Sequence, residues 1–158
     1  KAGVTIAELL RYNIFVNEFQ WRVLANEPQE EAKCVTAIDM AGCGLSQAKG
    51  EVIEFIKAVS AYRGAHYPER CSHIFVLNAP SWFAWLWKML APFVDPRTRS
   101  RTKIIAAPGW YGSTTEAYDE LAKVIEPSLI PEEYGGSGGA LGQADDELLL
   151  RRHVSSLD

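Results

Sequence analysis

Apolar positions recur along this chain in two rhythms, one typical of helices and one typical of buried strands. From Ile6 to Leu24 the apolar residues follow helical spacing, and Thr5 with Glu8 has capping-box spacing ahead of them. Later runs are short and continuously apolar, as expected of strands covered on both faces. Helices are therefore predicted over 6–25, 47–64, 81–93 and 113–124, and strands over 34–40, 74–77 and 104–105. Helices that alternate with strands predict an α/β domain with a largely parallel sheet.

Several residues mark where these elements begin and end. Pro28 lies in the polar stretch that ends the first helix, Ser46 can cap the second, and Ser113 with Glu116 forms another capping box. The stretch 135–142 is rich in glycine and is predicted to be a flexible linker. Residues 143–158 are predicted to be a polar tail with one short helical turn. Because the chain begins at Lys1 inside helix-forming sequence, we expect it to be a fragment.

The stretch from Asn78 to Lys103 has the most unusual pattern in the chain. Its first half is aromatic and apolar with Lys88 as its one charge, and it is shorter than the roughly 20 residues that cross a bilayer. Its aromatic residues fall on every side of the helix, unlike those of a surface helix with one apolar face. A protein core, an apolar ligand or a membrane surface must cover them, and the residues alone favour a core. The second half carries four basic residues, which would share one side of an extended chain: Arg97, Arg99, Arg101 and Lys103.

Composition and charge narrow the classes of function. A chain of 158 residues that is 47% hydrophobic and 23% charged is typical of one globular domain, and its net charge of −4 gives no reason to expect nucleic-acid binding. Its three cysteines, an odd number without metal-type spacing, indicate free thiols in a reducing compartment. The residues 135–139 match the G-x-S-x-G motif of esterases around Ser137, but no strand precedes them. We therefore expect no catalytic residues and no metal, and an esterase remains only as a rival interpretation.

Four motifs in order carry a family resemblance. They are Tyr67-Pro68-Glu69-Arg70, Phe75-Val76-Leu77-Asn78-Ala79-Pro80, Pro92-Phe93-Val94-Asp95-Pro96-Arg97-Thr98 and Leu129-Ile130-Pro131-Glu132-Glu133-Tyr134-Gly135-Gly136. Over about residues 5–136 the chain closely resembles the CRAL-TRIO lipid-binding domain of the phosphatidylinositol-transfer type. The first strand and the N-terminal helical bundle of that family are absent here. Residues 137–158 would then be a separate Gly-rich linker and polar tail.

The resemblance implies a fold and a gate. We expect a mixed, largely parallel β-sheet flanked by helices, which forms a hydrophobic pocket for one lipid. The helix after Pro80 would be a mobile gate that opens on a membrane. Its side chains would form the gate and line the acyl pocket: Trp82, Phe83, Trp85, Leu86, Met89, Leu90 and Phe93.

The resemblance also implies which residues bind the lipid headgroup. Glu69 and Arg70 match the residues of the family that bind the inositol headgroup. Thr98 and Arg101 match its threonine and lysine, with Lys103 as the alternative if the loop is two residues longer. Thr36 matches a hydroxyl used for phosphatidylcholine, and Cys34 replaces the usual serine beside it, where a thiol is a weaker hydrogen-bonding group.

The expected ligand is phosphatidylinositol, with phosphatidylcholine as a second candidate and no cofactor besides the bound phospholipid. The expected partners are a transient membrane surface and a lipid kinase, with no nucleic acid, and the expected location is cytoplasmic and peripheral on intracellular membranes. Two alternatives keep the same fold: a carrier of a tocopherol or retinoid, which Glu69 and Arg70 argue against, and a lipid-sensing module of a larger signalling protein.

Overall fold

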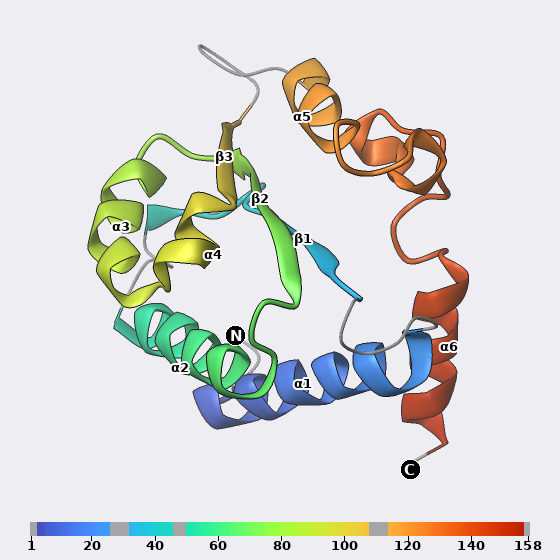
Figure 1. Cartoon of the computed structure of the whole chain (residues 1–158), viewed down its shortest axis with the longest axis horizontal. Coiled ribbons are helices and arrows are strands. Elements are labelled where there is room, and N and C mark those ends of the chain that lie inside the picture. Colours follow the sequence, from blue (N-terminus) through green and yellow to red (C-terminus); the bar gives the residue numbers. More distant parts are fainter. Residues whose placement is uncertain (1–2, 26–31, 46–49, 108–113, 157–158) are drawn as a thin grey trace. The chain divides into compact units, whose positions relative to one another are not determined.

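The computed structural model describes residues 3–25, 32–45, 50–107 and 114–156 (Figure 1). By its packing the chain divides into two compact units, residues 1–104 and 105–158, and each is described by itself. Pro28, Ser46 and Ser113, to which the sequence assigned helix ends, lie outside the described residues.

The first unit begins with the predicted amphipathic helix. Helix α1 (Ile6–Phe19) has a capping box at its start, in which the Glu8 amide donates to the Thr5 hydroxyl over 3.2 Å and the Thr5 amide donates to the Glu8 carboxylate over 2.7 Å. The helix continues into one π-helical turn, η1 (Gln20–Leu24). The predicted helix over 6–25 is therefore confirmed, and the buried Phe19 and Trp21 lie at its C-terminal end.

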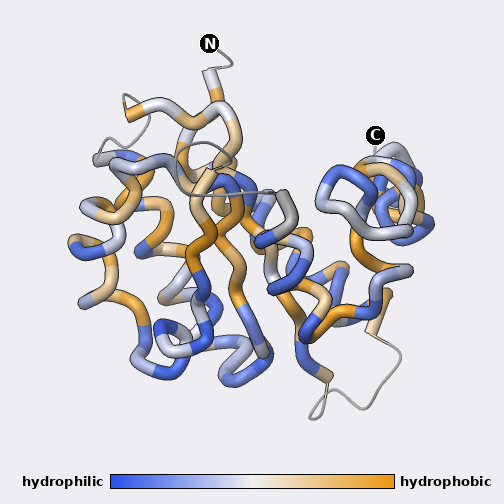
Figure 2. The backbone as a smooth tube through the Cα atoms, turned by 90° about the horizontal axis from the view of Figure 1, so that it is seen from above, coloured by the Kyte–Doolittle hydropathy of each residue, from blue (hydrophilic) through white to orange (hydrophobic). Residues whose placement is uncertain are grey.

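Three strands form the sheet, in the order β1 (Cys34–Asp39), β2 (Cys71–Ala79) and β3 (Thr102–Ala106). Strands β1 and β2 run parallel, with α2 (Gly50–His66) in the connection between them. Their register is irregular after Cys34, which lies opposite Cys71, because Val35 lies opposite His73. The α/β class with a largely parallel sheet is thus confirmed. In Figure 2, hydrophobic residues run through the centre of this unit, and hydrophilic residues lie at several of its outer turns.

The core of the first unit lies between β2 and helix α3 (Phe83–Leu90). Three residues of α3 at helical spacing, Phe83, Leu86 and Leu90, are buried against Val76 and Ala79 of β2. Partly buried residues complete this core: Met40, Ile53, Ile56, Trp82 and Trp87. A 3-10 turn, η3 (Ala91–Phe93), follows α3. Within the described residues, no helix has both the length and the apolarity to cross a membrane.

Arg97 and Arg99 lie in a short helix, so the four basic residues do not share one side as they would if the chain were extended. Helix α4 (Pro96–Ser100) begins at Asp95, whose carboxylate accepts hydrogen bonds from the amides of Arg97 at 2.8 Å and Thr98 at 3.3 Å. An aspartate at the N-cap followed by proline at the first helical position is a strong helix start. Because Asp95 and Pro96 together start a helix, the residues after them are not extended.

The second unit contains α5 (Thr114–Leu121), the 3-10 turns η4 (Pro127–Leu129) and η5 (Glu132–Tyr134), and α6 (Asp145–Ser155). The stretch predicted as a flexible linker is a hydrogen-bonded loop: the Gly138 amide donates to the Ile130 carbonyl over 2.9 Å, and the Ser137 amide to the Pro127 carbonyl over 3.0 Å. A side chain at Gly136 would collide with the Ile130 backbone, so glycine is required there for packing. Helix α6 is also longer than the single turn predicted for the tail.

Candidate functional site

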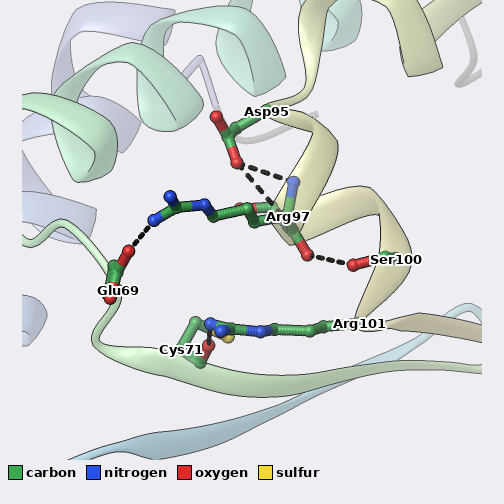
Figure 3. Close-up of polar contacts among 7 residues, drawn as sticks. Glu69, Cys71, Asp95, Arg97, Ser100 and Arg101 are labelled. Carbon is green, nitrogen blue, oxygen red and sulfur yellow. Dashed lines mark hydrogen bonds and ion pairs between the residues drawn. The ribbon is translucent and has the colours of Figure 1, made fainter.

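A tight turn between α2 and β2 presents Glu69. Its backbone is left-handed, with φ of 64°, which is uncommon for a residue other than glycine. Its carboxylate forms an ion pair with the guanidinium of Arg97 on α4 (Figure 3). The side chains of Glu69 and Arg97 are 57% and 71% exposed, so the pair is open to solvent and to a ligand.

Arg101 lies next to this ion pair. Its Nη1 donates to the Cys71 carbonyl over 2.8 Å, and its own carbonyl accepts from the Ile74 amide at 3.0 Å. Figure 3 shows the Arg101 side chain along the start of β2, near the Arg97 side chain that reaches to Glu69. The guanidinium groups of Arg97 and Arg101 therefore lie at one surface with the carboxylates of Glu69 and Asp95.

Thr98 belongs to the same short helix as Arg97. Its amide is held by Asp95, and its carbonyl accepts from the Thr102 hydroxyl at 2.9 Å. We call Glu69, Arg97, Thr98 and Arg101 the polar cluster. Lys103, the alternative to Arg101, lies two residues further along the chain and is exposed on β3.

Sequence reasoning did not assign Arg97 to the site, although it is the residue that pairs with Glu69. The sequence signal that could have identified Arg97 is the helix start at Asp95-Pro96. The short helix that begins there carries Arg97, which pairs with Glu69. In the extended strip that was predicted, Arg97 could not be distinguished from Arg99.

Arg70 follows Glu69 in sequence but has different partners. Its guanidinium carbon lies 4.9 Å from the centre of the Trp21 ring, and its Nη1 donates to the Ala32 carbonyl over 3.4 Å. These contacts attach the turn to the end of the N-terminal helix. The structure thus brings Glu69 together with Arg97 and Arg101, and it places Arg70 in a contact with Trp21.

A second set of contacts holds the other end of the same turn. The hydroxyls of Tyr67 and Tyr62 both donate to the Glu18 carboxylate, the latter over 3.0 Å, and Arg22 pairs with Glu18 at 2.6 Å. The Tyr67 hydrogen bond is the main cause that holds the pKa of Glu18 below its ordinary value. Burial, followed by the bond to Glu18, raises the pKa of Tyr67. No sequence motif had indicated Glu18, because the two tyrosines that donate to it are more than forty residues away.

Cys34 and Thr36 on β1 meet Cys71 on β2. The Thr36 hydroxyl lies 4.0 Å from the Cys34 sulfur and 3.9 Å from the Cys71 sulfur. The hydrogen bond with Cys71 is the main cause that lowers the pKa of Cys34 to about 6, and the same bond raises the pKa of Cys71. Because the Cys71 carbonyl also binds Arg101, this residue lies between the polar cluster and the two residues proposed for phosphatidylcholine.

The residues assigned to the gate helix and acyl pocket divide between two faces. Phe83, Leu86 and Leu90 are core residues, whereas the outward face exposes three large apolar side chains: Trp85 at 58%, Met89 at 38% and Phe93 at 58%. The Lys57 ammonium lies 3.8 Å from the centre of the Phe93 ring. An open groove of about 560 Å³ is lined by residues at the start of α1 and on α2, including Val4, Leu9 and Phe55, and not by α3.

The family model described as the CRAL/TRIO domain matches residues 2–136. The chain belongs to the CRAL/TRIO domain family. All the residues of the polar cluster lie within the matched range.

Curated relatives of this CRAL/TRIO domain include proteins of fungi and plants. CRAL-TRIO domain-containing protein YKL091C of Saccharomyces cerevisiae is 35% identical over 107 residues, which are 68% of this chain and 31% of that protein. SEC14 cytosolic factor of Kluyveromyces lactis is 30% identical over 120 residues, 76% of this chain and 36% of that protein. Phosphatidylinositol/phosphatidylcholine transfer protein SFH11 of Arabidopsis thaliana is 31% identical over 102 residues, 65% of this chain and 25% of that protein.

The CRAL/TRIO chain thus spans between 25% and 36% of the length of these relatives. Among solved structures, the crystal structure of Sfh5 superposes with a TM-score of 0.69 at 18% identity, covering 97% of this chain and 53% of that chain. At this identity the likeness is one of fold.

Proposed function

We propose that this CRAL/TRIO domain binds a phospholipid, phosphatidylinositol first, and exchanges it at membrane surfaces. The single observation that carries the proposal is the exposed ion pair of Glu69 with Arg97, which has a second guanidinium group, that of Arg101, next to it. The name of the relative SFH11, a phosphatidylinositol/phosphatidylcholine transfer protein, supports the same ligand class.

The chemistry of the polar cluster suits an inositol phosphodiester. Guanidinium groups such as those of Arg97 and Arg101 can hold the phosphate through two parallel hydrogen bonds. The Glu69 carboxylate can accept hydrogen bonds from inositol hydroxyls, and the Thr98 hydroxyl can donate or accept. We assign the phosphate to Arg101 before Lys103, because Arg101 lies against the start of β2 next to Arg97.

The acyl chains and the membrane need only apolar surface. In this proposal the outward face of α3, with Trp85 and Met89, and Phe93 of η3 rest on a bilayer during exchange. Each basic residue near an anionic leaflet adds about 1 kcal/mol to the binding of the protein to the membrane. A phosphatidylcholine would use Thr36 and Cys34. Transfer leaves the lipid chemically unchanged, so the proposed function is not enzymatic, and a lipid kinase is a candidate recipient of the lipid.

The test of this assignment is phosphatidylinositol transfer between vesicles by a Glu69→Lys variant. The substitution places a third cation beside Arg97 and Arg101 and removes the acceptor for the inositol hydroxyls. Unpaired polar groups cost about 1–3 kcal/mol, so we expect transfer to fall by about 5- to 150-fold. Because the Glu69–Arg97 pair is exposed, the thermal unfolding midpoint should barely move.

The matched control is Glu147→Lys, which makes the same charge change and also breaks an exposed ion pair, that with Arg151 on α6. Its transfer rate should equal that of the unchanged protein. Equal transfer by both variants and the unchanged protein would show that Glu69 does not bind the headgroup.

A further inference from the structure

Cys34 and Cys71 lie opposite each other on neighbouring strands. They are Cα partners in the parallel pair β1–β2, and neighbouring strands are about 4.8 Å apart. A disulfide requires a Cα separation of about 4.4–6.8 Å, so these two positions can be bridged without separating the strands. Both sulfurs also lie within 4.0 Å of the same hydroxyl, that of Thr36, and therefore on one side of the sheet.

The backbone around this pair is well held. The Cys34 amide donates to the Arg70 carbonyl over 2.8 Å, and the Ser72 hydroxyl donates to the Cys34 carbonyl over 3.1 Å. The irregular register after Cys34 adds one residue to β2 just beyond the pair. A bulge of this kind changes the local twist and re-aims side chains, and here it lies next to the two facing thiols.

We propose that Cys34 and Cys71 are a redox modification site, where a peroxide converts the two thiols into a reversible intramolecular disulfide. Nothing in the function proposed above requires this reaction. The third cysteine, Cys43, lies in the turn beyond the other end of β1, and the length of that strand alone, about 16 Å, separates it from the pair.

The electron and proton balance of the reaction assigns different roles to the two sulfurs. Hydrogen bonding by Cys71 favours the thiolate of Cys34, which attacks a peroxide oxygen, becomes a sulfenic acid and releases water once a proton is taken up. Cys71 then attacks the Cys34 sulfur. It displaces hydroxide, which takes the Cys71 proton and leaves as a second water. In total two thiols are oxidised by two electrons and one peroxide is reduced to two waters.

The first step removes the main cause that keeps Cys71 protonated. The pKa of Cys71 is raised chiefly by its hydrogen bond with Cys34 and also by burial. Once Cys34 is a neutral sulfenic acid, the Cys71 thiol no longer donates a hydrogen bond to a thiolate. Cys71 is therefore placed to act as the resolving cysteine. A dithiol reductant reverses the reaction, because its own oxidation to a disulfide restores both thiols.

The test is peptide mapping by mass spectrometry of the full chain after treatment with hydrogen peroxide and alkylation without reductant. We expect one crosslinked peptide pair containing Cys34 and Cys71, lighter by two hydrogens, in a monomeric protein with Cys43 alkylated. Dithiothreitol should restore all three alkylated cysteines. A crosslink through Cys43, or three alkylated thiols after peroxide, would overturn the proposal.

Three variants separate the steps. Cys43→Ser should form the disulfide as before. Cys71→Ser should stop at the sulfenic acid of Cys34, which dimedone captures as an adduct, and Cys34→Ser should leave Cys71 as an alkylated thiol. A dimedone adduct on Cys71 and not on Cys34 would contradict the assigned order. These readouts contain no lipid, so they stand or fall independently of lipid transfer.

Discussion

Glu69 places a carboxylate at a backbone position that disfavours it. A left-handed backbone destabilises the folded state by about 1–2 kcal/mol for a residue other than glycine. The exposed ion pair with Arg97 stabilises it by only about 0–1 kcal/mol. Glycine would fit the turn better if the turn served only to connect α2 to β2. Strain of this kind concentrates at functional sites, which agrees with a headgroup role for this side chain.

The strain can be measured by comparing Glu69→Gly with Glu69→Ala. Both variants lose the ion pair, so the difference between their free energies of unfolding has two opposing contributions. The left-handed backbone disfavours alanine, and the larger entropy of glycine in the unfolded chain disfavours glycine by about 0.5–1 kcal/mol. We expect the glycine variant to have the higher free energy of unfolding, by up to about 1 kcal/mol, in urea titrations with equal m-values. Both should lose phosphatidylinositol transfer. An alanine variant that is more stable than the glycine variant would contradict strain at this residue.

The Glu18 carboxylate makes the stability of the first unit depend on pH. Its pKa in the folded state lies below the ordinary 4.5, chiefly because Tyr67 donates to it. A lowered folded pKa means that this contribution is complete above about pH 4.5 and is lost as the pH falls through the folded value. We expect Tyr67→Phe to lower the free energy of unfolding by about 0.5–1.5 kcal/mol at pH 7 and by less in acid.

The control is Tyr12→Phe, which removes a hydroxyl from an exposed tyrosine of α1. Its stability should follow that of the unchanged protein at every pH. A Tyr67→Phe effect that is the same at pH 7 and in acid would show that the Glu18 charge is not involved.

Helix α3 has one buried face and one face with exposed apolar side chains. Its inner face, with Phe83, Leu86 and Leu90, packs on β2 and stabilises the unit. Its outer face exposes Trp85 at 58% and Met89 at 38%. The question raised by the sequence, whether core, ligand or membrane covers these residues, thus has a divided answer: the core covers one face, and the other is available for a lipid or a bilayer.

Paired alanine substitutions on α3 should separate the two faces. Leu86→Ala removes a side chain that is 2% exposed and should cost about 2–5 kcal/mol in free energy of unfolding. Trp85→Ala should change stability by no more than about 0.5 kcal/mol, yet lower co-sedimentation with anionic vesicles. Unchanged vesicle binding by Trp85→Ala would contradict the role of the outer face.

The sequence predicted elements better than it predicted contacts. The α/β class, α1 with its capping box and the strands of the sheet follow from apolar periodicity, because each is fixed by local signals and burial. The helix α4 was missed although Asp95-Pro96 signals it, and the loop around Gly136 was taken for a linker because its packing on Ile130 is invisible in composition. Family motifs supplied Glu69 and Arg101.

Other contacts of the site could not be predicted from the sequence. The partners of Arg70 and Glu18 depend on how α1 lies against the turn, and that is a tertiary property. The same holds for the meeting of Cys34 with Cys71, which depends on strand register.

At the scale of the whole chain, the family match and the packing divide the sequence at different places. The CRAL/TRIO match runs over residues 2–136, and the first compact unit ends at Ile104, inside β3. The polar cluster, the thiol pair and α3 all lie in that first unit. The chain also covers only part of each curated relative, so the lipid is best identified on the full-length protein.

The most direct test of the proposed function is mass spectrometry of the lipids that co-purify with the full-length protein. We expect phosphatidylinositol as the main bound species, with phosphatidylcholine second, and we expect phosphatidylinositol to be lost from the Glu69→Lys variant but not from Glu147→Lys. Recovery of a tocopherol or retinoid without phosphoinositide, or equal phosphatidylinositol in both variants, would contradict it.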